Sequence, residues 1–224
     1  MAEATSDQAL EIEQDPEQGI EQEINQHTHS EFDRAKDFAR MQRIGTWHAA
    51  AVLAALTLFG AGNIWAAQSG LVLAHVVAIA NTLVVGRVVG SILHEWGHFA
   101  GARLSGAHSP VLSKPVKLFF MFNFDMENNS VEQFVWMSMG GIITNWVIAI
   151  AALLMLPLDT LSGAALAAVF IGIAVNVSYF EVPVVLRTRE TGNPKNELQT
   201  QLDTQGLSQT PGIIVGALVW LALV

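Results

Sequence analysis

The chain has 224 residues, of which 51% are hydrophobic and 14% are charged, with a mean hydropathy of +0.39 and a net charge of −9. This composition excludes an ordinary soluble domain and indicates an all-α polytopic membrane protein. The absence of cysteine excludes disulfide bonds and cysteine chemistry, and we expect no nucleic-acid partner.

The N-terminal 43 residues differ in composition from the rest of the chain. Residues 1–33 contain ten Asp or Glu, no Lys or Arg, and few apolar side chains. Such a segment cannot bury a core, so we expect a disordered cytoplasmic tail on which a partner could dock. Residues 34–43 form a basic stretch that ends this region, and we expect a transmembrane domain over residues 44–224.

Four apolar stretches are long enough to cross a membrane, at about 46–67, 71–104, 132–157 and 162–186. A last apolar run begins at Pro211 and has 14 residues to Val224, which are too few to cross alone. We therefore expect four to five transmembrane helices.

The one substantial loop of the membrane domain covers residues 105–131. Its run LFFMFNFDM, residues 118–126, is rich in aromatic side chains, which favour strands and membrane interfaces. We therefore predict a short membrane-associated strand in this loop. The alternative is an ordinary loop with apolar side chains.

The distribution of basic residues predicts the topology. Lys and Arg occur in segments 34–43, 103–117 and 187–195, whereas the connectors 68–70 and 157–161 contain neither. Because cytoplasmic loops are enriched in Lys and Arg, four alternating spans place all three basic segments in the cytoplasm. We expect a multi-pass protein of a bacterial inner membrane with a cytoplasmic N-terminus.

The second apolar stretch contains the sequence His94-Glu95-Trp96-Gly97-His98. On a helix, His94 and His98 lie one turn apart on the same face and can hold one metal ion, while Glu95 lies about 100° around the helix. Ionisable side chains are costly in an apolar segment, so a function is the default explanation for them. The pattern predicts metal-assisted hydrolysis with Glu95 as the base, a third protein ligand from elsewhere, and a fourth position open to water.

The predicted topology favours Glu181 as the third ligand, because it lies at a depth in the fourth span similar to that of the two histidines. Glu181 could instead pair with Arg187 or Arg189 at the membrane interface. Four further carboxylates remain as alternative ligands, the first two at the entrance to the third span: Glu132, Glu127, Asp159 and Asp203.

Small residues also follow a pattern on the helix that carries the two histidines. Four glycines form a stripe beside the histidines: Gly86, Gly90, Gly97 and Gly101. Small residues at this spacing let another helix approach closely and bring in the missing ligand.

Three polar residues lie deep within the predicted spans. Arg87 shares the face of His94 and could stabilise an oxyanion or control the access of water. It could instead extend to the nearer interface or pair with a carboxylate. Asn145 and Asn176 lie near mid-membrane, where amides usually join helices but could also orient a substrate backbone.

The segment SILHEWGHFAGARLSG, residues 91–106, resembles the active-site helix of the site-2 protease family of intramembrane zinc metalloproteases. The later sequence Gly-Gly-Ile-Ile-Thr-Asn, residues 140–145, resembles that family's Gly-Pro-x-x-Asn element, with Ile in place of Pro. The resemblance covers about residues 80–186 and implies a three-span metalloprotease core. The family's third ligand is an Asp in a Leu-Asp-Gly element, which this chain lacks, and Glu181 stands in the corresponding place.

The resemblance implies Zn²⁺ bound by His94 and His98, Glu95 as the general base, and Asn145 near the scissile peptide. It also implies that the loop after the active-site helix pairs with an unwound substrate segment as an added strand. We therefore expect a zinc metalloendopeptidase that cleaves transmembrane protein substrates near the cytoplasmic side of the bilayer. The alternative is a non-proteolytic metal-binding or transport protein that uses the same cluster.

Overall fold

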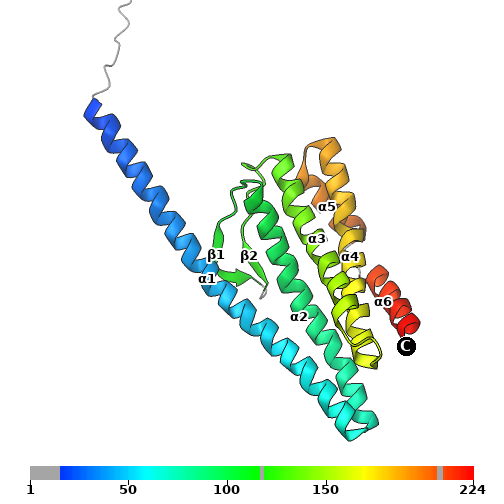
Figure 1. The fold of residues 1–224 in the computed structure, drawn as a ribbon. Coiled ribbons are helices and arrows are strands. Elements are labelled where there is room, and N and C mark those ends of the chain that lie inside the picture. Colours follow the sequence, from blue (N-terminus) through cyan, green and yellow to red (C-terminus); the bar gives the residue numbers. More distant parts are fainter. Residues whose placement is uncertain (1–15, 117–118, 206–208) are drawn as a thin grey trace, which may run out of the picture. The chain divides into compact units, whose positions relative to one another are not determined.

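A computed structural model describes residues 16–116, 119–205 and 209–224 of the chain. The chain divides into two units, Met1–Ala39 and Arg40–Val224, and the second unit contains every candidate site residue. The elements follow one another in this order (Figure 1): α1 (Pro16–Ser69), α2 (Val72–Leu104), β1 (Val111–Val116), β2 (Phe120–Phe122), α3 (Val131–Met155), α4 (Leu161–Thr191), α5 (Pro194–Gln205) and α6 (Thr210–Leu223).

Four helices are long and apolar enough to cross a membrane, and they cover the four apolar stretches predicted from the sequence. They are Asp33–Ser69 within α1, and the helices α2, α3 and α4, whereas α6 is apolar but shorter. Local chemistry explains where several of them begin and end. Ser130 and Gln133 form a reciprocal capping box at the start of α3, and Gly192, with φ at 71°, follows the end of α4.

The helix α1 begins at Pro16, far before the apolar stretch predicted from about residue 46. Residues 16–43, which we predicted as part of a disordered tail, are therefore helical in the structure, and residues 1–15 lie outside the described part. Low hydrophobicity excludes a packed core in this segment but does not exclude a helix. Its Glu, Gln, Ala, Lys and Arg residues have favourable helix propensities, so the helix of the first span can extend through it.

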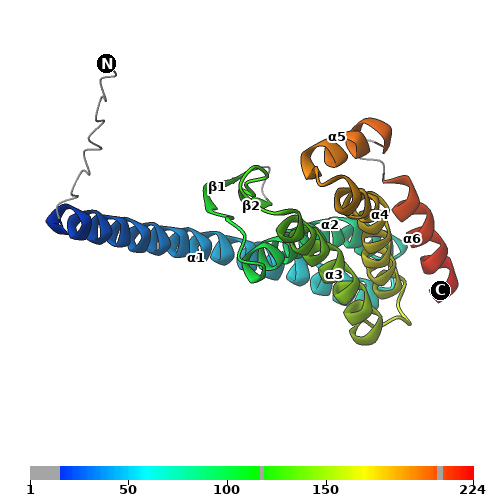
Figure 2. The ribbon, with the colours of Figure 1, turned by 90° about the horizontal axis from the view of Figure 1, so that it is seen from above.

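The helices α2, α3 and α4 lie side by side in both views (Figure 1, Figure 2). Val85 of α2, Ala149 of α3, and Leu166 and Phe170 of α4 belong to one buried apolar cluster. Lipid tails are as apolar as these side chains, so close packing holds such helices together within a membrane more than the hydrophobic effect does. This three-helix bundle is the scaffold of the candidate site.

The predicted glycine stripe of α2 contacts two helices rather than one. A Cβ atom at Gly86 or Gly90 would lie 2.3 or 3.0 Å from side chains of α4. A Cβ atom at Gly97 or Gly101 would lie 2.5 or 2.2 Å from carbonyl oxygens of α3. The stripe therefore lets α4 approach one half of α2 and α3 approach the other half.

The chain between α2 and α3 forms an antiparallel hairpin of β1 and β2. The strand predicted within residues 118–126 is thus found in β2, although residue 118 lies outside the described part, and its partner β1 was not predicted. Val111 and Met121 pack with Ile44 of α1 and Phe99 of α2 in a buried apolar cluster. This cluster holds the hairpin against the helix that carries the two histidines.

Two arginines of α1 contact the outer edge of β1. Arg40 Nη1 donates a hydrogen bond to the carbonyl oxygen of Val111 at 3.2 Å, and Arg43 Nη2 donates one to the carbonyl oxygen of Ser113. Exposed strand edges pair readily with other chains, so these donors protect the outer edge of β1. These two hydrogen bonds cover the outer edge of β1 and not that of β2.

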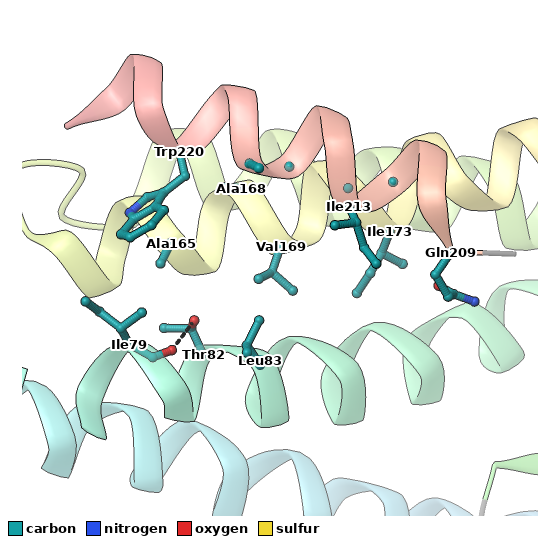
Figure 3. Close-up of a pocket in the computed structure, with 14 residues that line it drawn as sticks. Ile79, Thr82, Leu83, Ala165, Ala168, Val169, Ile173, Gln209, Ile213 and Trp220 are labelled. Carbon is teal, nitrogen blue, oxygen red and sulfur yellow. Dashed lines mark hydrogen bonds between the residues drawn. The ribbon is translucent and has the colours of Figure 1, made fainter. Parts of the chain in front are cut away.

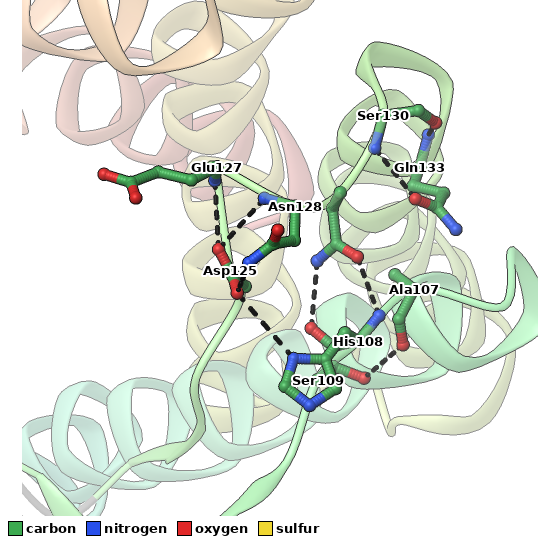
Figure 4. A network of polar contacts seen from close by, with 9 residues as sticks. Ala107, His108, Ser109, Asp125, Glu127, Asn128, Ser130 and Gln133 are labelled. Atoms are coloured by element: carbon green, nitrogen blue, oxygen red, sulfur yellow. Dashed lines mark hydrogen bonds and ion pairs between the residues drawn. The ribbon is translucent and has the colours of Figure 1, made fainter. Parts of the chain in front are cut away.

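Hydrogen bonds order the chain between β2 and α3 (Figure 4). The side-chain amide and the backbone N–H of Asn128, and the N–H of Glu127, donate to the carboxylate of Asp125 and lower its pKa. A carboxyl group whose pKa falls on folding stabilises the fold above its ordinary pKa, and this contribution disappears as the pH falls through the lowered value. This loop is therefore expected to loosen in acid.

The polar segment after α4 contains the helix α5. Asn193 and Pro194 begin it with a side-chain cap and a proline at the first helical position. Arg187 of α4 donates to Glu197 Oε2 at 2.9 Å and to Gln201 Oε1 at 2.6 Å. These two bonds fix α5 against α4.

The helix α6 runs antiparallel to α4 and packs against it closely. A Cβ atom at Gly172 would lie 2.6 Å from the carbonyl oxygen of Gly212, and one at Gly212 would lie 2.4 Å from that of Gly172. At the other end of α6, Trp220 Nε1 donates to the carbonyl oxygen of Leu161 at 3.1 Å. The last apolar run thus follows α4 back to its first turn.

Candidate metal centre

The helix α2 places His94 and His98 one turn apart, as the sequence predicts. Their Nε2 atoms lie 2.9 Å apart, and their ring centroids lie 4.3 Å apart. The side chains are 15% and 12% exposed, so both imidazoles lie largely inside the helix bundle. Two histidines in this arrangement can share one metal ion.

Glu181 of α4 completes the group. Its Oε1 atom lies 3.3 Å from the Nε2 atom of His94 and 3.3 Å from that of His98. Arg187, the alternative partner predicted for Glu181, pairs instead with Glu197 at 2.9 Å. The three side chains form a group that could hold a metal ion.

The spacing of the three donor atoms fits a metal site. Ligand atoms about 2.0–2.1 Å from a tetrahedral zinc ion lie about 3.3 Å from one another, and the observed separations are 2.9, 3.3 and 3.3 Å. The second carboxylate oxygen of Glu181 is buried and has no hydrogen-bond partner among the described residues. A carboxylate in this position costs free energy unless a cation neutralises it, which supports the fit.

Two groups of α3 orient the imidazoles. The Nδ1–H of His98 donates to the carbonyl oxygen of Met137 at 2.9 Å, which leaves the Nε2 lone pair available to a metal. The amide nitrogen of Asn145 lies 3.0 Å from Nδ1 of His94. If the side-chain amide of Asn145 is rotated by 180°, its oxygen accepts a hydrogen bond from Nδ1–H of His94. The Nε2 lone pair of His94 is then also available to a metal.

Glu95 lies on α2 between the two histidines and is only 7% exposed. It is close enough to His94, His98 and Glu181 for their charges to interact. The structure thus places the predicted base beside the three predicted ligands, with its side chain largely buried.

Gly141 of α3 leaves the space that the two imidazoles need. A Cβ atom at this position would lie 2.4 Å from His98 Cε1 and 2.8 Å from His94 Cε1. Replacing Gly141 by alanine is therefore expected to weaken metal binding by about tenfold or more, because the rings must move. Titration with a chromophoric chelator measures this loss.

The matched control for Gly141→Ala is Gly60→Ala, since Gly60 is also helical and its Cβ atom would meet nothing within 4 Å. The control is expected to bind metal as the wild type does. Equal metal affinities of the two variants would contradict the close approach of Gly141 to the imidazoles.

Asn145 is buried, with 2% of its surface exposed, and contacts His94 rather than open space. Asn145→Ala is expected to weaken metal binding by about 10–100-fold, the usual cost of losing a group that orients a histidine ligand. Asn176→Ala is the matched control, because Asn176 donates instead to Gln209 Oε1 at 3.3 Å. Unaltered metal affinity in the Asn145 variant would exclude its orienting role.

The remaining predicted candidates lie elsewhere. Asn176 faces α6, where its amide nitrogen contacts Gln209 and its oxygen is buried without a hydrogen-bond partner among the described residues. Four carboxylates are exposed and do not belong to the group that could hold a metal: Glu127, Glu132, Asp159 and Asp203.

Sequence reasoning missed the contact between α1 and the motif. Trp96 Nε1 donates to Nδ1 of the buried His48 at 3.1 Å, and the indole packs over Gly45. A histidine three residues after a glycine in an apolar stretch was the available signal, because both residues then share one face of α1. The contact fixes α1 against the helix that carries His94 and His98.

Comparison of the chain with protein-family models, with curated proteins and with solved structures finds no match. The case for a function therefore depends on the residues and geometry described above.

Proposed function

We propose that this chain is an intramembrane metallopeptidase that hydrolyses peptide bonds of membrane-spanning protein segments. The observation that carries the proposal is the meeting of His94, His98 and Glu181, on two apolar helices, beside the buried Glu95. Two histidines and a glutamate are the protein ligands of several catalytic zinc sites, so zinc is the proposed ion.

A bound zinc ion would polarise the peptide carbonyl group and lower the pKa of water at its open position. Glu95 would accept a proton from the attacking water as the new C–O bond forms. It would then donate that proton to the nitrogen of the leaving amine as the C–N bond breaks. The burial of Glu95 supports this role, because a dehydrated site strengthens electrostatic interactions with the reacting groups. The contact of Asn145 with His94 supports a positioning role for its amide.

The number of ligands favours catalysis over a structural metal. In the described part of the chain, the group has three members, whereas a structural zinc site is enclosed by four protein ligands. A fourth position open to water is what hydrolysis requires. We therefore prefer the peptidase to a protein that only binds or transports metal.

We also propose a cytoplasmic location for the N-terminus and for the end of α2 that carries the metal centre. The support is the concentration of Lys and Arg at 34–43, 103–117 and 187–195 and their absence from 68–70 and 157–161. A peptide bond within a helix is shielded and hydrogen-bonded, so the substrate must unwind near this side.

The hairpin offers a place for the unwound segment. Arg40 and Arg43 cover the outer edge of β1, so an added substrate strand would pair with β2. The apolar cluster of Val111, Met121 and Phe99 fixes the hairpin to α2. The added strand would therefore lie beside the helix of the metal centre.

The proposal is tested with purified protein in liposomes and a panel of reporter proteins that each carry one membrane-spanning segment. Cleavage of at least one reporter is expected, with loss on addition of a zinc chelator and recovery when zinc is restored. A water-soluble form of the same segment is the control and is expected to be cut poorly. Absence of cleavage across the panel by protein that holds one metal per chain would refute the peptidase function.

A further inference from the structure

A groove runs between α2 and α6, with α4 as its floor (Figure 3). It has a volume of about 380 Å³, and its lining is apolar apart from Thr82 and Gln209. Ile79 and Trp220 lie at one end, and Ile173 and Gln209 lie at the other (Figure 3). This is a surface that suits an apolar chain segment.

The groove and the metal centre share one face of α2. Leu83 lines the groove, Arg87 follows one turn later, and His94 lies two turns beyond Arg87. These three positions fall within about 40° of one another around the helix axis. A segment that leaves the groove along this face therefore passes Arg87 before it reaches the metal centre.

Arg87 is exposed on this face, and the described residues offer it neither a hydrogen bond nor an ion pair. It lies near the middle of α2, more than about 20 Å along the axis from either helix end. An unpaired cation within an apolar helix that crosses a membrane is costly, and an acidic side chain on an apolar segment would offset that cost.

We propose that Arg87 selects substrates that carry an acidic side chain near the cleaved bond, with the apolar segment beyond it seated in the groove between α2 and α6. This inference rests on the proposed peptidase function and names the substrate feature that the site recognises. The guanidinium pairs with a single Asp or Glu of the substrate, which would otherwise be an unpaired charge within the membrane.

The distance along α2 sets where that acidic residue lies. Arg87 precedes His94 by seven residues, or about 10 Å, and helical side chains point back toward the N-terminus of the helix, which adds a few ångströms. An extended peptide advances about 3.3 Å per residue. The preferred acidic residue is therefore about three to five residues from the cleaved bond, on the side of the bond that lies in the groove.

The test moves one Asp through a cleavable membrane-spanning reporter, position by position on both sides of the cleaved bond, with Asn at the same position as the neutral control. The protein is the full chain in liposomes, loaded with zinc. We expect the kcat/KM ratio of the Asp reporter to the Asn reporter to reach about tenfold at three to five residues on one side only. A ratio near one at every position would overturn the inference.

Variants of Arg87 provide a second test of the inference. Arg87→Gln is expected to lower the Asp-to-Asn ratio to about one, Arg87→Lys to retain part of it, and Arg87→Glu to prefer a Lys reporter. Metal content equal to wild type shows that each variant has folded around an intact centre. A ratio that persists in Arg87→Gln would overturn the inference. Cleavage without charge preference refutes only the role of Arg87, whereas absence of all cleavage refutes the proposed function.

Discussion

Replacing Glu95 by glutamine is expected to lower peptide hydrolysis by about 10²–10⁴-fold while the metal content stays at the wild-type level. The amide is nearly the same size as the carboxylate, so the buried position of Glu95 remains filled. It cannot accept the proton of the attacking water, so the loss falls on the chemical step. Initial rates with a membrane-spanning reporter, together with metal analysis of the same sample, measure both quantities.

Glu132→Gln is the control for this experiment, because Glu132 is an exposed carboxylate in the first turn of α3, outside the metal group. It is expected to hydrolyse the reporter at the wild-type rate. Full activity in the Glu95 variant would show that another group serves as the base.

Removing the carboxylate of Glu181 is expected to weaken metal binding by about 100-fold or more. Loss of a group that merely orients a ligand costs about 10–100-fold, and Glu181 Oε1 lies 3.3 Å from both Nε2 atoms. Glu181→Ala leaves two imidazoles, which hold a divalent ion far less tightly than three ligands do. Equilibrium titration with a competing chelator gives the affinity, and reporter cleavage should fall in parallel.

Glu197→Ala provides the comparison for Glu181→Ala. Glu197 is also a buried carboxylate at this end of the bundle, but it pairs with Arg187 and not with the histidines. Its loss is expected to free α5 from α4 and leave metal affinity within a few-fold of wild type. If Glu181→Ala retains wild-type affinity, the third ligand is a different residue.

Hydropathy was sufficient to predict the four long spans, since each needs only a continuous apolar stretch of membrane length. It failed at α1 and α5, where polar residues continue or begin a helix. In α5 the sequence Asn193-Pro194 is a helix start signal, but hydropathy does not detect it because the segment is polar. The hairpin was found only in part, because the pairing of β1 with β2 is a tertiary feature.

The histidine pair could be predicted because its geometry is local to one helix. The approach of Glu181 depended on how α4 packs on α2, and predicted membrane depth was only a guide to it. The contact of His98 with the carbonyl of Met137 could not be predicted, because a backbone oxygen leaves no trace in the amino-acid pattern. Gly141 was visible as a small residue, but its role as space for two imidazoles required the packing of α3 on α2.

The most direct test of the central claim is zinc X-ray absorption spectroscopy on the purified full chain, with metal content measured on the same material. The account predicts one ion per chain, bound by two imidazoles and a carboxylate at about 2.0–2.2 Å, with the signal lost in His94→Ala. Folded protein that neither contains nor takes up a stoichiometric metal would contradict it. The cluster would then be a chain of hydrogen bonds from Asn145 through His94 and His98 to Met137.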